Sequence, residues 1–389
     1  MDSKAVDTLI VGSGVIGQAL AFRLKALRPN ASVAVVGDPM NSLAASRAAA
    51  GMLAPYCESE TDDRFFRFAV ASLKRYPDFL RELSGVAGRT IGYNAAGSLM
   101  PECQMQERFE PQLTFLKNAG VPYELWSQSE ARARLPVLAA DIGRVAWVPE
   151  ALVNNRQLHD ALQEANRRRG VTQHAGVCVS GFHRSGRHLT AAATDHGDLP
   201  AKQMVLATGS WSQALAEVLG LHLPIKPIKG QMCRVQAPAV GREAGAGGMG
   251  GTGGTGGEVL PYNMHGKLSY IAPWPDHGGW VVGSTQEDRG FEPAIENSVI
   301  EGLVERAASM VPLLKTLPIV ERWTGLRPAA EDRMPVIGAS GRYDNLYFST
   351  GHFRNGILLT PMSAEYLAGV MLGDAVSLIP EFAPARYDL

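Results

Sequence analysis

A short stretch near the N-terminus decides the fold: residues 7–17 read DTLIVGSGVIG. Its apolar, β-branched start predicts a buried strand, and the apolar residues that follow recur at helical spacing up to Pro29. A second buried-strand pattern lies at residues 33–36. A strand, a glycine turn, a helix and a strand within about 30 residues predict a βαβ unit.

Three glycines, Gly12, Gly14 and Gly17, stand where this first strand passes into the helix. Glycines at such a turn let a pyrophosphate approach backbone N–H groups closely, and the helix N-terminus adds a partial positive charge. The stretch therefore predicts dinucleotide binding, with Val15 and Ile16 as further contacts at the start of the helix. It does not distinguish NAD from FAD.

The end of the second strand departs from the usual dinucleotide pattern. An acid commonly stands there to hold the ribose hydroxyls, but this position falls on Gly37, and Asp38 comes next. We expect either that Asp38 binds the adenosine ribose from one residue further on, or that the backbone alone holds it.

The composition predicts a soluble enzyme of the cytoplasm. The 389 residues are 46% hydrophobic and 19% charged, which fits a sizeable core in one large or two smaller domains. With 37 basic and 38 acidic residues, no large basic field for nucleic acid or anionic lipid is expected. The four cysteines lack metal-ligand spacing, and no segment approaches the ~20 apolar residues of a membrane span.

The rest of the chain alternates between helical and strand patterns. Helices are predicted at residues 62–82, 156–169 and 356–372, and a buried strand at 204–207 closes on Gly209, a further candidate for cofactor contact. Short alternating or aromatic runs such as CRVQ, LSYIAP and WVVGST predict a β-rich region from residue 225 to 284.

Residues 241–257 form a low-complexity, glycine-rich segment. Such a segment cannot bury apolar area, so we expect a mobile loop or hairpin tip, with a functional lid as the alternative.

Three further stretches resemble a known family. They are SRAAAGMLAP at residues 46–55, WTGLRP at 323–328 followed by DRMPVIG at 332–338, and GHFRNGILL at 351–359. In this order and with this spacing they closely resemble the glycine oxidase branch of the D-amino-acid oxidase superfamily of flavoproteins. The similarity runs from residue 7 to about residue 373, most of the chain.

The resemblance implies an α/β fold and non-covalently bound FAD. It implies a discontinuous, Rossmann-like (doubly wound) FAD-binding domain and a second, β-rich substrate-binding domain. We expect the first to comprise residues 1–90, 150–222 and 325–389, and the second residues 91–149 and 223–324.

The resemblance also implies cofactor contacts along much of the chain. Ala45 and Ser46 would lie near the phosphates, Ala50, Gly51 and Met52 along the isoalloxazine ring, the backbone of Val177 at adenine, and His352, Phe353, Arg354, Asn355, Gly356, Ile357 and Leu358 beside the pyrimidine end of the flavin. A physical reason supports the last set, because reduced flavin carries negative charge near N1 and O2, and the N–H groups of a helix start suit that charge.

Three residues are implied at the substrate. Arg327 matches the family's carboxylate-binding arginine, and a guanidinium offers a fixed bidentate fork for such a group. Tyr270 matches a tyrosine whose hydroxyl lines the site, and Arg354 matches a second active-site arginine at the flavin edge. Without the resemblance, each residue has an alternative interpretation: Arg327 could form a surface ion pair, and Tyr270 could face the core of a sheet.

Several residues leave the substrate open. Gln286 occupies a position that is apolar in some relatives, and Leu268 falls where a relative carries a polar aromatic side chain. Glu58 and Glu60 are interpreted as solvated loop acids rather than catalytic ones.

The leading hypothesis is oxidation of a small amino acid, glycine first, by hydride transfer from the α-carbon, which needs no side-chain base provided that the amine arrives neutral. The products would be an imine and then an oxo acid, ammonia and, with oxygen as acceptor, hydrogen peroxide; the imine could feed thiamine synthesis. The alternatives are a D-amino-acid or secondary-amine dehydrogenase with another acceptor, an amine oxidase of a specialised pathway, and a flavin-binding partner without turnover. Whether the chain forms a homo-oligomer is left open.

Overall fold

The computed structural model describes residues 4–237, 260–274, 278–374 and 377–389. The glycine-rich segment 241–257, predicted as a loop or hairpin tip, lies outside these residues. Among the described helices, none is long and apolar enough to cross a membrane.

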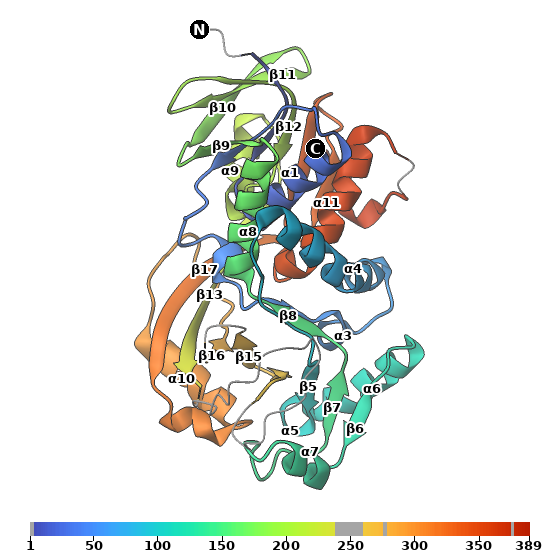
Figure 1. Ribbon diagram of the computed structural model, residues 1–389, viewed down its shortest axis with the longest axis vertical. Coiled ribbons are helices and arrows are strands. Elements are labelled where there is room, and N and C mark those ends of the chain that lie inside the picture. Colours follow the sequence, from blue (N-terminus) through green and yellow to red (C-terminus); the bar gives the residue numbers. More distant parts are fainter. Residues whose placement is uncertain (1–3, 238–259, 275–277, 375–376) are drawn as a thin grey trace.

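The first sheet lies in the upper half of Figure 1 and is built on the predicted βαβ unit. Strand β1 pairs in parallel with β2 and β12, and β9 and β19 extend the parallel part on either side. A hairpin of β10 and β11 joins β12, and β18 joins β19, both in antiparallel fashion. The strands are β1 (Val6–Val11), β2 (Val33–Gly37), β9 (Thr172–Ala175), β10 (Val179–Ser185), β11 (His188–Thr194), β12 (Leu199–Leu206), β18 (Val336–Ala339) and β19 (Leu346–Thr350).

Alternate side chains of the central strands enter different cores. Ile10 and Val35 pack among helical residues, whereas Leu9 and Ala34 pack on the opposite side with residues of β11 and β12. Burial on both faces explains why the central strands read as almost continuous apolar runs. The predicted α/β fold class is confirmed, with helices on one face of the sheet and a hairpin and a short helix on the other.

Four helices cover the first face and pack against one another: α1 (Val15–Leu27), α4 (Arg64–Ala87), α8 (Asn155–Arg168) and α11 (Gly356–Leu372). Each begins or ends where the sequence allows it. The carboxylate of Asp63 accepts from the N–H of Phe66 at the start of α4, and Gly88 ends that helix with φ of 65°. The predicted helix at 62–82 ends five residues before the observed end of α4 at Ala87. The prediction missed Gly88 as the residue that ends the helix.

The second sheet occupies the lower half of Figure 1, in the order β17-β13-β16-β15-β14-β5-β7-β6. The predicted β-rich region supplies β13, β14, β15 and β16. The strands are β5 (Ser98–Pro101), β6 (Glu124–Trp126), β7 (Val145–Val148), β13 (Ile225–Gln236), β14 (Asn263–His265), β15 (Tyr270–Trp274), β16 (Gly279–Gly283) and β17 (Ile319–Ala330).

A small third sheet of β3 (Met52–Leu53), β8 (Ala151–Val153) and β4 (Tyr93–Asn94) lies between the two large ones. The remaining helices are α2 (Ala45–Ala48), α3 (Pro55–Glu58), α5 (Glu102–Met105), α6 (Phe109–Asn118), α7 (Gln128–Arg134), α9 (Ser212–Val218) and α10 (Asn297–Ala308), with 3₁₀ turns η1 (Gln106–Arg108), η2 (Gly209–Trp211), η3 (Pro312–Thr316), η4 (Pro380–Phe382) and η5 (Pro384–Tyr387).

The two large sheets follow the two expected groups of segments closely. Strands of the first sheet fall within the segments expected to bind FAD, and strands of the second fall within those expected to bind substrate, except that β17 crosses the expected boundary at residue 325. The division into two domains stays a prediction.

Candidate active site

A cavity of about 760 Å³ is walled by the glycine turn after β1, helix α2, the start of α11 and one face of the second sheet. It brings together residues from every stretch that the sequence singled out. The predicted site residues in its wall are Gly12, Gly14, Val15, Ile16, Asp38, Ala45, Ser46, Ala50, Gly51, Met52, Val177, Gly209, Tyr270, Arg327, His352, Phe353, Arg354, Asn355, Gly356 and Ile357.

Two predicted cofactor residues, Gly17 and Leu358, are not part of that wall. A Cβ atom on Gly17 would lie 2.0 Å from the carbonyl oxygen of Gly12, so this glycine allows α1 to pack closely against the turn. Leu358 is buried in the helical core, and its carbonyl oxygen accepts from the hydroxyl of Ser72 at 2.6 Å. The structure gives both residues a packing role.

The turn after β1 fits a pyrophosphate. Gly12 has φ of 122°, and a Cβ there would lie 2.3 Å from the carbonyl oxygen of Ala207. A Cβ on Gly14 would lie 2.9 Å from Oγ of Ser46, which itself accepts from the N–H of Val15 at 3.1 Å. No acidic residue stands in the first turn of α1. The helix N-terminus therefore presents partial positive charge at the cavity wall.

The end of the cavity at which the ribose is expected lies between the ends of β2 and β9. The N–H of Gly176 donates to the carbonyl of Gly37 at 3.1 Å, which brings Val177 beside Asp38 in the cavity wall. Asp38 is exposed, and its Oδ1 accepts from the N–H of Met40 at 2.8 Å. Its contact with a ribose stays a prediction, as does that of Val177 with adenine.

The start of α11 forms the opposite end of the cavity wall. The side chain of the N-cap residue Asn355 accepts no hydrogen bond from the first N–H groups of α11. The N–H of Phe353 donates to the carbonyl of Pro328 at 2.9 Å and ties this turn to β17. His352 is buried, its Nε2 lies 3.0 Å from Oγ of Ser363, and burial lowers its pKa to about 3. The imidazole is therefore neutral.

Arg327 lies on β17 with its guanidinium in the cavity wall. Its Nη1 donates to the carbonyl of Thr285 at 3.0 Å, and its Nη2 donates to Oγ of Ser284 at 2.6 Å. These neutral acceptors fix the plane of the guanidinium, and burial lowers the pKa of Arg327 below its usual value. The alternative of a surface ion pair is wrong for this residue.

Tyr270 lies on β15 and faces the same cavity. Its hydroxyl is 3.9 Å from Sδ of Met232, and a Cβ on Gly283 would come within 2.5 Å of that hydroxyl. Burial raises the pKa of Tyr270, so the phenol is protonated at neutral pH. The alternative in which this ring only fills a sheet core does not hold, because the residue lines the cavity.

Arg354 is paired across the cavity wall with Glu58, Nη2 to Oε1 at 2.9 Å. The side chain of Glu58 is only 21% exposed, so its interpretation as a solvated loop acid is wrong: it ends α3 in the cavity wall. Glu60 is solvated as expected and pairs with Arg108. The ion pair partly neutralises Arg354, which sets it apart from Arg327.

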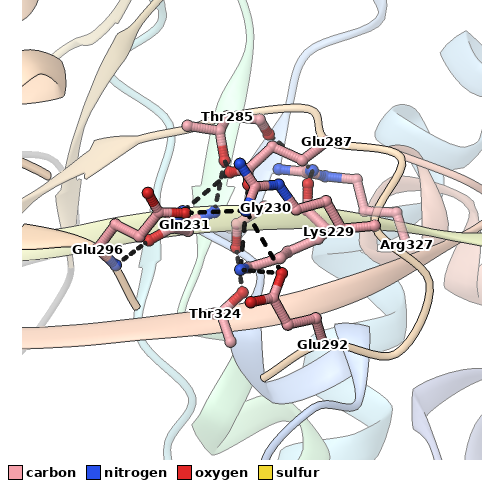
Figure 2. Close-up of polar contacts among 10 residues, drawn as sticks. Lys229, Gly230, Gln231, Thr285, Glu287, Glu292, Glu296, Thr324 and Arg327 are labelled. Atoms are coloured by element: carbon pink, nitrogen blue, oxygen red, sulfur yellow. Dashed lines mark hydrogen bonds and ion pairs between the residues drawn. The ribbon is translucent and has the colours of Figure 1, made fainter. Parts of the chain in front are cut away.

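Figure 2 shows a polar network beside Arg327 that is centred on the buried Lys229. Lys229 on β13 has no solvent exposure, and its Nζ lies 3.6 Å from a carboxylate oxygen of Glu292 and 4.0 Å from one of Glu287. The hydroxyl of Thr285 donates to the carboxylate of Glu287, and Lys229 and Glu287 exchange backbone hydrogen bonds at 2.9 Å. The network thus holds the segment whose carbonyl accepts from Arg327.

Two ionisable residues of the site escaped sequence reasoning. His265 lines the cavity directly opposite Tyr270 on the antiparallel strand β14, and its Nε2 lies 3.8 Å from Oε2 of Glu150. The spacing of His265 and Tyr270 across a short turn could have indicated a hairpin, and thereby a shared face. Glu150 carries no comparable signal, because it precedes β8 at a distant point of the chain.

The comparisons with known proteins agree with this geometry. The chain is 33% identical to the bifunctional protein ThiO/ThiG of Synechocystis sp. over 98% of its own length and 54% of that protein. It thus spans about half the length of that protein and of two further ThiO/ThiG relatives that it matches. It is 28% identical to the glycine oxidase of Pseudomonas aeruginosa, covering 97% of this chain and 98% of that one.

Solved structures and the family pattern point the same way. The crystal structure of glycine oxidase from Geobacillus kaustophilus superposes with a TM-score of 0.87 at 27% identity, over 97% of this chain and 98% of that chain. The sequence pattern of the DAO family, described as FAD dependent oxidoreductase, matches residues 7–370. The chain is therefore a member of the DAO family of FAD-dependent oxidoreductases.

Proposed function

We propose that the chain oxidises a small amino acid, with glycine as the first candidate, at the carbon that carries the amine. The observation that supports this proposal is the state of Arg327. Its guanidinium lies in the cavity wall on neutral acceptors, and within the described part of the chain no carboxylate forms an ion pair with it. A partly buried cation without a counter-ion favours an anionic ligand, and an amino acid supplies a carboxylate.

The cradle at Gly12 and Gly14 and the uncapped start of α11 fit the pyrophosphate and the flavin of FAD respectively. Bound FAD would supply the redox chemistry, taking a hydride from the substrate α-carbon at N5 and passing the electrons to oxygen to give hydrogen peroxide. The oxidised amine is an imine, which water hydrolyses to an oxo acid and ammonia.

Arg327 and Arg354 would position the substrate rather than react with it. Arg327 would bind the carboxylate and so fix the direction in which the α-hydrogen points. Arg354 is a weaker candidate for a carboxylate clamp, since Glu58 already pairs with it. Gln286 and Leu268 line the cavity as well, so the wall is neither wholly apolar nor wholly polar.

The electron acceptor and the pathway are part of the proposal. We propose oxygen as acceptor, and oxygen-electrode traces with and without a dye acceptor would separate an oxidase from a dehydrogenase. Relatives named ThiO/ThiG support a role in supplying an imine to thiamine thiazole formation. The experiment for that role is complementation of a thiamine auxotroph that lacks its own amine oxidase.

The decisive test is anaerobic mixing of the FAD-loaded protein with a panel of amino acids while flavin absorbance is followed. Glycine or another small amino acid should bleach the flavin, and an amine of the same size without a carboxylate should not. If dithionite bleaches the flavin but no amino acid or secondary amine does, the protein is a flavin-binding partner without turnover, and the proposed function is wrong.

A further inference from the structure

His265 and Glu150 form a buried pair of ionisable groups at the cavity wall that the proposed reaction has not yet used. Glu150 is 2% exposed, and its Oε1 accepts from the N–H groups of Tyr56 at 2.6 Å and Cys57 at 2.9 Å. Its other oxygen, Oε2, and Nε2 of His265 lie 3.8 Å apart, and both are buried without a hydrogen-bond partner. Buried polar atoms without partners are rare in folded proteins, so this pair calls for an explanation.

The pair connects the protein interior with the cavity. His265 stands opposite Tyr270 in the pairing of β14 with β15, and residues paired in this way share a face of the sheet. Both line the cavity that Arg327 also lines. The imidazole of His265 therefore lies between the cavity and the carboxyl group of Glu150.

The proposed reaction needs such a connection. A free amino acid carries an ammonium group at neutral pH. Hydride can leave the α-carbon only when the attached amine is neutral, because the lone pair of the nitrogen stabilises the cation that forms. One proton must therefore leave the substrate nitrogen before the hydride is transferred in the cavity. A neutral imidazole can accept a proton on one nitrogen and release one from the other.

Resting on the proposed function, we propose that His265 and Glu150 form the route by which the substrate ammonium loses its proton. The imidazole accepts a proton from the ammonium and gives its own Nε2 proton to Oε2 of Glu150. One N–H bond of the substrate breaks, one O–H bond forms on Glu150, and no electrons are transferred. The product is a neutral amine beside a neutral carboxylic acid, and a relaxation of about 1 Å brings the two atoms to hydrogen-bond distance.

The protonation states of the pair support this direction. Burial raises the pKa of Glu150 to about 7, so the acid can both accept and release a proton near neutrality. Burial lowers the pKa of His265 to about 4, so the imidazole is neutral and acts only as a relay. A proton acceptor is most effective when its pKa lies near the working pH.

The groups around the pair do not compete for the proton. Burial raises the pKa of the Cys57 thiol well above its usual value and also raises that of Tyr56, so both stay neutral on the Glu150 side. On the cavity side, the nearby charges of Glu58 and Arg354 act on His265 in opposite directions. Tyr270, the direct neighbour, keeps its proton because burial raises its pKa.

The test is the pH profile of anaerobic flavin reduction at saturating glycine, or at the best substrate of the panel. The wild-type rate constant should rise with pH through about 7 and then level off. In Glu150→Gln the midpoint should move to that of a free α-amino group, about 8, so the rate at pH 7 should fall by roughly 5-fold. Glutamine keeps an oxygen for the N–H groups of Tyr56 and Cys57, which preserves the fold around it.

The second variant, His265→Gln, should show the same displaced profile, and both variants should approach the wild-type rate at high pH. His222→Gln, at an exposed histidine outside the cavity wall, is the matched control and should leave the profile unchanged. A merely structural role would lower the rate at every pH or reduce FAD content, without moving the midpoint.

Three outcomes are distinguishable. Displaced profiles in both variants support the relay. Profiles that coincide with the wild type, or a uniform loss at every pH, overturn it while leaving the proposed function intact. A wild-type flavin that no amine substrate reduces contradicts the proposed function itself.

Discussion

Gly230 leaves just enough room for Arg327: a Cβ on this glycine would lie 2.3 Å from Nη1 of the guanidinium. The two residues lie on the paired strands β13 and β17, and the guanidinium lies across the backbone of its neighbour strand. The orientation of the Arg327 guanidinium on β17 thus depends on the absence of a side chain at Gly230 on β13.

Gly230→Ala should displace the guanidinium and slow flavin reduction at limiting substrate by about 10²-fold, because misplacement by about 1 Å is enough for such a loss. FAD content should be unchanged, since neither residue belongs to the cradle of β1. The matched control is Gly85→Ala, where a Cβ meets nothing within 4 Å and activity should stay at the wild-type level. Wild-type kinetics in Gly230→Ala would show that the arginine is not a substrate residue.

Arg327→Ala should remove the carboxylate clamp itself. Leaving the substrate carboxylate unpaired costs about 2–5 kcal/mol by analogy with a truncated buried charge pair, or about 30-fold to several-thousand-fold in the rate of flavin reduction at limiting substrate. Arg327→Lys should recover only part, because an ammonium lacks the bidentate fork. The control is Arg322→Ala, at an exposed arginine of the same strand. Reduction of the alanine variant by glycine as fast as the wild type would contradict the clamp.

Gly14→Val should abolish FAD retention. Its Cβ would already lie 2.9 Å from Oγ of Ser46, and two further methyl groups would enter the cradle where α1 begins. The measurement is the ratio of flavin to protein after purification, with far-UV circular dichroism to show that the chain is folded. A folded variant with one flavin per chain would rule out the cradle.

Lys229→Met should lower the free energy of unfolding by roughly 2 kcal/mol, because it removes the fully buried cation of the network and leaves the carboxylate of Glu287 only the half-exposed Arg289, whose Nε lies 3.6 Å away. Adding Glu287→Gln should recover part of this loss, since the residues interact directly. Lys226→Met is the control on the same strand: its exposed pair with Asp288 at 2.9 Å should be worth less than about 1 kcal/mol. Equal losses in urea melts of the two single variants would contradict a buried ion-pair network.

Acid precipitation should release FAD into the supernatant. Among the four cysteines, all of which the structure describes, Cys178 is the one in the cavity wall. It lies beside Val177 at the expected adenine end, away from the expected flavin ring to which a covalent link would be made. His352, near the expected ring, is buried with its Nε2 3.0 Å from Oγ of Ser363. Flavin fluorescence that stays with the precipitate would show a covalent link.

The sequence by itself determined those features whose signals are local. The run 7–17 specified strand, turn and helix, since apolar periodicity and glycine conformations act between near neighbours. The start of α11 at Gly356 was likewise predicted at the residue where it begins. The motifs further along the chain identified the family, and with it FAD, before any contact was known.

Only the tertiary structure decided how the side chains of the site are partnered. Glu58 looked solvated until Arg354, nearly three hundred residues away, was placed beside it. Arg327 could have been a surface arginine until β13 and β17 paired in a register that lays it over Gly230. The pairing of His265 with Glu150 joins β14 to the residue that precedes β8. Charge, burial and proton affinity depend on which distant segments pack together, and the packing of distant segments has no local signature in the sequence.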